Sequence, residues 1–98
     1  MARFHLSKAA TRDLQQIIGY IRQRSATAAK RVKSELRSEI SKLASMPHLG
    51  HVREDVTVTH LRFWSHYSYL IVYNPNSKPL EVVRILHGAR DLHRFFNE

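Results

Sequence analysis

The stretch from Leu80 to Phe96, LEVVRILHGARDLHRFF, decides the fold that we predict. Its first half has β-branched and aliphatic residues at both odd and even positions, which is typical of a strand buried on both faces. We therefore expect a central strand of a sheet over residues 80–86. The strand then runs into a polar turn, hinged on a glycine, that consists of His87, Gly88, Ala89, Arg90 and Asp91. Polar groups at the end of a buried strand are the first place to look for function.

The composition sets limits on the kind of protein. A chain of 98 residues supports one domain, residues 1–98, with one core. Its 16 Lys and Arg against 8 Asp and Glu give a net charge of +8, which predicts an anionic partner, either nucleic acid or an acidic protein segment. Cysteine is absent, which excludes disulfides and thiolate chemistry. We find no signal-peptide core and no apolar run near the roughly 18 residues of a membrane span, and expect a cytoplasmic protein.

Two amphipathic helices are predicted in the first half of the chain. Ser7 is a good N-cap, and one apolar stripe at helical spacing runs to about Arg24 through Ala10, Leu14, Ile17, Ile18 and Ile21. After a short break at residues 25–27, a second stripe runs until Pro47 through Ala29, Val32, Leu36, Ile40 and Leu43. So short a link predicts an antiparallel helical hairpin.

The remaining strands complete an α+β fold. Residues 3–6 alternate and suit a brief edge strand, and residues 56–73 contain two strands separated by a turn at 65–68. A second turn at 74–79 leads into the central strand. We expect a three- to four-stranded antiparallel sheet with the helical hairpin on one face, followed by a short C-terminal helix.

The outer face of the second helix is basic. It carries Lys30, Arg31, Lys33, Arg37 and Lys42, with Glu35 and Glu39 among them. Two interpretations stay open, a solvated face with i,i+4 ion pairs and a nucleic-acid-binding stripe. Direct nucleic-acid binding is secondary in our interpretation, because the other basic residues are spread over the chain and no DNA-reading motif is present.

The order of elements, with YLIVY at 69–73 and VVRILHGARDL at 82–92, resembles the ParE branch of the RelE/ParE toxin superfamily. The resemblance covers nearly the whole chain. It implies the toxin of a type II toxin–antitoxin system, neutralised by a small cognate antitoxin. It further implies DNA gyrase as the target, or, for RelE-like members, ribosome-bound mRNA as the substrate of an endonuclease. Many relatives have a glycine in the turn before YLIVY, where this chain has Ser65-His66, so the geometry of that turn is open.

An RNA-cleaving site would need a general acid or base and arginines that hold the charge of the phosphorane. The candidates for such a site are His87, Arg84 and Arg62, together with His66 and Tyr67. In a regular strand, however, Arg84 lies on the face opposite to Val83, Ile85 and His87. We therefore predict that the protein is not an enzyme, with nuclease activity as the alternative.

Structural roles compete for the same side chains. Buried Arg84 would need a carboxylate from Asp91, Glu81 or the antitoxin. The His87 imidazole could hydrogen-bond the turn while Gly88 takes a positive φ, and Asp91 could cap the final helix or pair with an arginine. We expect Arg62 to be exposed.

Aromatic and histidine residues allow two further interpretations. We expect Trp64 and the four tyrosines to pack in the core and sheet and not to stack on bases. The closest histidine pair, His48 and His51, sits in a predicted loop with no third ligand at a recognised spacing. We accordingly predict no metal site and no cofactor.

Our functional prediction is a toxin that acts on DNA gyrase by protein contact. The predicted target-binding residues are His87, Arg90, Asp91, His93, Arg94, Phe95 and Phe96. The predicted antitoxin-binding residues are Arg62, Arg84, Leu14, Ile18 and Ile21, with the antitoxin in the groove beside the hairpin or added at a free sheet edge.

Overall fold

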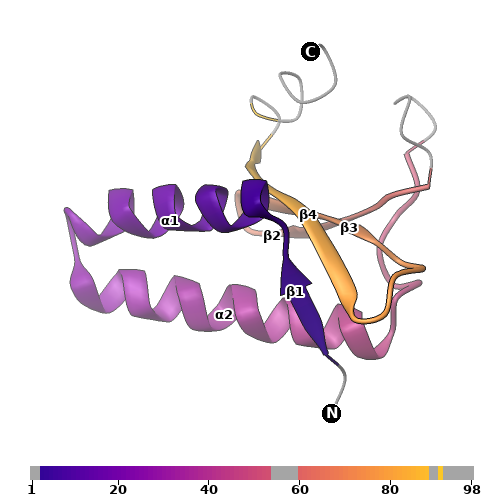
Figure 1. The fold of residues 1–98 in the computed structure, drawn as a ribbon. Coiled ribbons are helices and arrows are strands. Elements are labelled where there is room, and N and C mark those ends of the chain that lie inside the picture. Colours follow the sequence, from indigo (N-terminus) through magenta and orange to yellow (C-terminus); the bar gives the residue numbers. More distant parts are fainter. Residues whose placement is uncertain (1–2, 54–59, 89–90, 92–98) are drawn as a thin grey trace.

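A helical hairpin packed on a four-stranded sheet makes up residues 3–53, 60–88 and 91, the part of the chain that this computed structural model describes (Figure 1). The elements follow in the order β1 (Phe4–Leu6), α1 (Lys8–Arg22), α2 (Ala26–Ser45), β2 (Arg62–His66), β3 (Tyr69–Asn74) and β4 (Leu80–His87). This is the predicted α+β class with the predicted element order. The predicted C-terminal helix falls mainly on residues outside the described ranges.

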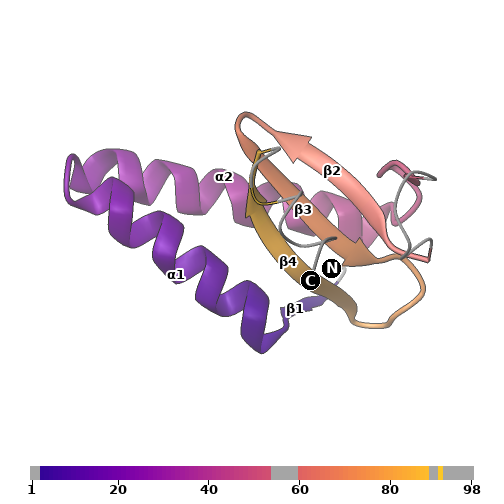
Figure 2. The ribbon, with the colours of Figure 1, turned by 90° about the horizontal axis from the view of Figure 1, so that it is seen from above.

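Both helices begin where the sequence indicates. The Ser7 hydroxyl accepts a hydrogen bond from the Ala10 N–H (3.0 Å), and the Ser25 hydroxyl accepts one from the Ala28 N–H (3.1 Å). α1 ends at Arg22, two residues earlier than predicted, and α2 ends just before Pro47. The two helices lie side by side and antiparallel (Figures 1 and 2), so the predicted hairpin is confirmed.

The sheet has the strand order β1-β4-β3-β2. The three consecutive strands β2, β3 and β4 are antiparallel neighbours, as predicted. β1 differs, because it runs parallel to β4 with Phe4 opposite Leu80 and Leu6 opposite Val82, so the sheet is mixed and not wholly antiparallel. The hairpin and the meander together form the long connection that parallel neighbours require.

A β-bulge interrupts β4 at Val83. Val82 lies opposite Tyr73 and Arg84 lies opposite Val72, so Val83 is the extra residue. The prediction that Val83 and Ile85 share one face is therefore wrong. Val83 packs with Leu86 on one side of the sheet, whereas Ile85 belongs to the cluster on the other.

The core has two parts, one on each face of the sheet. The larger lies between sheet and hairpin and includes Leu36, Ile40, Ile71 and Ile85. The smaller covers the other face with Leu61, Phe63, Val72 and Leu86. β4 contributes to both, which confirms a central strand buried on two faces. Tyr73 is fully buried, but Tyr20 (59% exposed) and Tyr67 (80% exposed) contradict the expectation that all four tyrosines pack inside.

The loop after α2 is held by a buried phenol. The Tyr73 hydroxyl accepts a hydrogen bond from the Gly50 N–H (2.8 Å) and donates one to the Pro47 carbonyl (2.6 Å). A Cβ at Gly50 would meet the Tyr73 ring and hydroxyl, so a glycine is required there. One residue on, His51 forms a two-way bridge with Phe63 of β2 (2.8 and 2.9 Å), which fixes the loop along the edge of the sheet.

The β2–β3 hairpin turns at Tyr67 and Ser68, within the predicted turn. Tyr67 has φ of 53°, in the left-handed region, and its ring contacts the His66 ring edge-on (4.6 Å between centroids). The turn thus takes the conformation that a glycine would adopt without strain. A tyrosine in this region carries a conformational cost of about 1–2 kcal/mol.

Replacing Tyr67 with glycine should raise the free energy of unfolding by about 1 kcal/mol, because glycine adopts this φ at no steric cost. Tyr67→Ala is the matched control, since it removes the ring but keeps the Cβ. Urea unfolding of the three proteins measures the effect. Equal stability of the glycine and alanine variants would contradict the conformational explanation.

Candidate functional site at the end of strand β4

A cavity of about 430 Å³ opens where β3 and β4 meet the second half of α1. It is lined by Gln16, Ile17, Tyr20, Ile21, Tyr69, His87 and Asp91. The strand-end residues His87 and Asp91 thus face the same hollow as the exposed edge of α1. We call this cavity the β4-end pocket.

His87 is exposed at the rim of the β4-end pocket and stacks on Tyr69, with 5.3 Å between ring centroids and 28° between planes. The two residues lie directly opposite each other in the β3–β4 register. Burial raises the pKa of the Tyr69 phenol, so its hydroxyl stays protonated and can donate a hydrogen bond at neutral pH. An imidazole and a phenol are thus side by side at one surface.

The turn after His87 brings Asp91 back onto the strand. Gly88 has φ of 67°, which confirms the predicted positive φ. A carboxylate oxygen of Asp91 accepts a hydrogen bond from the backbone N–H of His87 (3.0 Å). Asp91 therefore fixes the end of β4 while its side chain lines the β4-end pocket.

Arg84 is bound to a carboxylate that the sequence analysis did not consider. Its Nε and Nη2 donate to the two oxygens of Asp13 on α1 (2.7 and 3.0 Å). One of these oxygens also accepts the backbone N–H of Ile85 (3.0 Å). The prediction of Asp91, Glu81 or the antitoxin as the partner of Arg84 did not include this carboxylate.

Arg62 is not the exposed cation that we expected. It is half-buried, and its guanidinium donates to the carbonyls of Gly50 (2.8 Å) and His48 (3.3 Å). The structure therefore does not bring Arg62 to His87. It gives Arg62 a structural role in the loop after α2.

His66 points to α2 and not to His87. Its side chain is 19% exposed, with Nδ1 3.7 Å from a Glu39 oxygen and Nε2 4.0 Å from a Glu35 oxygen. Glu39 also accepts hydrogen bonds from Trp64 Nε1 (3.0 Å) and Lys42 Nζ (3.3 Å). The Lys42 ammonium lies 4.9 Å from the centre of the Trp64 ring.

The predicted antitoxin-binding stripe on α1 is divided between two surfaces. Ile21 lines the β4-end pocket. Leu14 and Ile18 line a separate groove of about 210 Å³ between the helices, with Gln15, Arg22 and Lys33. Ile18 is only 6% exposed, so Leu14 is the more accessible of the two in that groove.

Five predicted target-binding residues lie outside the described residues: Arg90, His93, Arg94, Phe95 and Phe96. His87 and Asp91 are the predicted target-binding residues that the structure brings together.

Sequence reasoning missed Asp13, Tyr69, Tyr20 and Gln16. A signal for Asp13 exists, because it is the sole carboxylate among residues 1–34. Tyr69 could have been inferred from a tight turn at 67–68, because that turn fixes the register of the strands.

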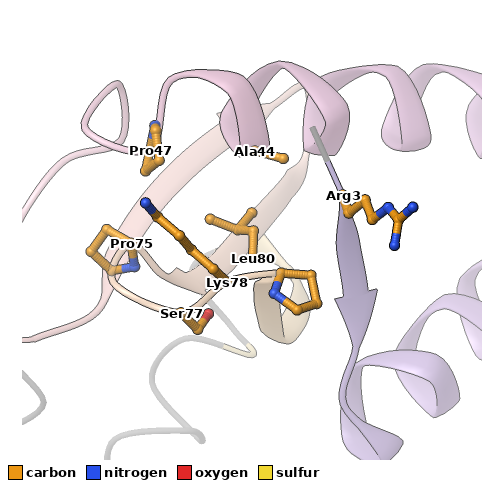
Figure 3. A pocket seen from close by; sticks show the side chains of 8 residues that line it. Arg3, Ala44, Pro47, Pro75, Ser77, Lys78 and Leu80 are labelled. Carbon is orange, nitrogen blue, oxygen red and sulfur yellow. The ribbon is translucent and has the colours of Figure 1, made fainter. Parts of the chain in front are cut away.

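A second cavity, of about 310 Å³, lies at the start of β4, near the start of β1 and the end of α2 (Figure 3). Its lining is largely apolar and includes Pro47, Pro75, Pro79 and Leu80, with no histidine, tyrosine or carboxylate. Arg3 and Lys78 also line it, and Figure 3 shows the Arg3 guanidinium turned away from the other lining residues. Acid–base groups therefore converge at the β4-end pocket and not here.

Two further properties concern metal and membrane binding. Among the described residues, no group of three His, Cys, Asp or Glu side chains is arranged to hold a metal ion. Within the same residues, neither helix combines the length and apolarity that crossing a bilayer requires.

The short first strand, the helical hairpin and the antiparallel meander of this chain are consistent with the RelE/ParE-like fold. The sequence matches, over residues 4–92, the family described as ParE toxin of type II toxin-antitoxin system, parDE. The chain therefore belongs to the ParE toxin family, and the family implies a cognate antitoxin as its partner. No curated protein matches the sequence.

Replacing Asp13 with alanine should lower the free energy of unfolding by about 3 kcal/mol, because it leaves Arg84 without this carboxylate and the Ile85 N–H without its acceptor. Arg84→Met should cost less, about 1–2 kcal/mol, because the carboxylate keeps the Ile85 N–H. The double variant should be close to Asp13→Ala. Chemical unfolding of all four proteins gives the coupling, and strictly additive losses would contradict a shared interaction.

The stability should depend on Glu39 in a pH-dependent way. The hydrogen bond from Trp64, helped by Lys42, lowers the pKa of Glu39 below its ordinary value of 4.5. The charged form thus stabilises the fold above about pH 4.5, and this contribution is lost as the pH falls through the lowered pKa. Glu39→Gln should reduce the free energy of unfolding by about 1 kcal/mol at pH 7 and by less at a pH below the lowered pKa of Glu39.

Thermal unfolding at the two pH values measures this effect. Trp64→Phe removes the N–H donor, so Glu39→Gln should lose less stability in that background. An equal loss of stability at both pH values would show that the Glu39 charge is not involved.

Proposed function

We propose that this ParE-family toxin poisons DNA gyrase by protein contact, so that cleaved DNA accumulates and replication stops. One observation carries the proposal. An RNA-cleaving site would need arginines near His87, but both candidate arginines are already hydrogen-bonded to other groups. Arg84 is paired with Asp13, and Arg62 donates to loop carbonyls. A contact surface does not require either guanidinium to be at the reacting phosphate.

The β4-end pocket suits such a contact. Its apolar part is formed by Ile17 and Ile21, and its rim carries the exposed Tyr20 and His87. Aromatic side chains beside an apolar hollow are typical of the centres of protein interfaces. We propose that gyrase contacts this pocket. The tail residues His93–Phe96, which lie outside the described residues, remain predicted target-binding residues.

The antitoxin is proposed to bind along α1. The groove with Leu14 and Ile18 is bordered by Arg22 and Lys33, so an acidic segment with apolar side chains would be complementary to it. Because Ile21 lines the β4-end pocket, an antitoxin that covers α1 as far as Ile21 would also cover part of the proposed gyrase contact. We infer a cytoplasmic location, since gyrase and its DNA are there.

The alternative is a ribosome-dependent mRNA endonuclease. One observation favours it: the His87 imidazole stacks on the Tyr69 phenol, and Asp91 lines the same pocket. A histidine and a tyrosine could supply the base and the acid for attack by a ribose 2′-hydroxyl. In that case Tyr69 and His87 would carry the chemistry.

The two functions are distinguished by testing purified toxin in parallel on gyrase with supercoiled plasmid and on ribosomes programmed with mRNA. We expect linear, gyrase-dependent DNA and intact message. His87→Ala with Tyr20→Ala should weaken gyrase inhibition at least tenfold, because both side chains border the contact. His5→Ala, an exposed histidine on β1, is the control.

Cleaved message with normal supercoiling would overturn the gyrase proposal. Tyr69→Phe then separates the roles of the pocket. It keeps the ring that stacks on His87 and removes the hydroxyl, so a hundredfold loss of cleavage would assign acid catalysis to Tyr69.

A further inference from the structure

The end of the helical hairpin has a concentration of positive charge that the proposed gyrase contact does not use. Residues 14–34 contain no Asp or Glu. The same segment carries five cations, Arg22, Arg24, Lys30, Arg31 and Lys33. We call these five residues the basic tip. All five are exposed.

The carboxylates of the hairpin do not neutralise the basic tip. Asp13 is bound to Arg84, and Glu39 is bound to Trp64 and Lys42. Glu35 lies beside His66. Within the described part of the chain, no cation of the tip forms an ion pair, and Arg24 lies over the Tyr20 ring (5.5 Å).

The basic tip projects from the body of the protein. Figures 1 and 2 both show the connection between α1 and α2 at the end of the molecule that is farthest from the sheet. The cations come from the last residues of α1, the linker and the first two turns of α2. They are therefore close together and accessible from several sides.

We propose that the basic tip binds the phosphate backbone of duplex DNA. Its exposed neighbours Gln23, Thr27 and Ser34 carry hydrogen-bond donors. Proteins contact DNA phosphates with Arg and Lys together with such polar side chains.

Protein partners would instead need apolar anchors. The groove with Leu14 and Ile18, bordered by Arg22 and Lys33, offers such anchors to the antitoxin. Outside that groove, the exposed residues from 22 to 34 include no apolar side chain larger than alanine. Residues 22–34 include no aromatic residue on which single-stranded bases could stack, and the nearby Tyr20 ring already has Arg24 over it. Both observations favour the duplex.

The tip is next to the proposed gyrase contact. Tyr20 lines the β4-end pocket and Arg24 lies over its ring, so one surface continues into the other. A toxin with both surfaces would contact the enzyme and the DNA that it holds. DNA binding by the tip does not depend on the gyrase proposal, because it is measured without gyrase.

The test uses fluorescence anisotropy of a labelled 20-base-pair duplex with the full chain at several salt concentrations. The variant is R24Q/K30Q/R31Q, which leaves the groove residues Arg22 and Lys33 unchanged. We expect at least a tenfold weaker affinity at about 0.1 M salt. The slope of log K against log salt should fall in magnitude by about 2 to 3.

The matched control is R3Q/K8Q/K78Q, which removes three exposed cations outside the tip. It should keep most of the affinity and the slope. The variant R24K/K30R/R31K preserves the charge and should bind as the wild type does. Circular dichroism verifies that each variant is folded.

Four results would overturn the proposal. The first three are a wild-type protein without salt-dependent DNA binding, an equal loss in the matched control, and a loss in the charge-preserving variant. The fourth is normal DNA binding by R24Q/K30Q/R31Q. If R24Q/K30Q/R31Q binds DNA normally but loses the antitoxin or anionic vesicles, the tip belongs to that other partner and the proposal is wrong. Gyrase inhibition is measured separately, so failure of either proposal is recognised independently.

Discussion

The hydrogen bonds of the Asp13 carboxylate hold α1 against the edge of β4, and this contact sets how the hairpin core meets the sheet. β1 pairs with β4 only as far as Val82. Beyond that point the edge of β4 is exposed to α1, where Ser7 donates its N–H and its hydroxyl to the carbonyls of Val82 and Val83. Asp13 continues this pattern by accepting the Ile85 N–H and by holding Arg84. The N-cap and first turns of α1, from Ser7 to Asp13, thus occupy the edge of β4 where a neighbouring strand would otherwise pair. The bulge at Val83 lies within this part of β4.

Much of the fold was predictable, because its signals are local. The two helical stripes, the N-caps at Ser7 and Ser25, and the break before Pro47 each depend on residues close in sequence. Two features were not predictable. The direction of β1 is set by its partner and not by its own three residues. The bulge cannot be recognised in the hydrophobic pattern of the strand. Val82, Val83, Ile85 and Leu86 are all apolar, so a register shift of one residue leaves apolar side chains on both faces.

The candidate site divides in the same way. His87, Gly88 and Asp91 were predictable because a strand end and a positive-φ glycine place them together. The partners of the arginines were not, since Arg84 and Asp13 are 71 residues apart and the carbonyls that Arg62 binds carry no side-chain signature. Arginines that look available in a sequence can thus be committed to the backbone or to a distant helix. In this protein that commitment is what favours a contact surface over a catalytic centre.

The bridge between His51 and Phe63 affects the tendency of the toxin to aggregate before the antitoxin binds it. β2 is an edge of the sheet, and an unprotected edge invites other chains to add strands and aggregate. Both backbone groups of Phe63, the second residue of β2, are already bonded to His51. The loop that carries His51 is in turn held by Tyr73 and Arg62. A foreign strand would have to displace this anchored loop, so the pairing works as a guard against edge-to-edge aggregation of newly made, still unneutralised molecules.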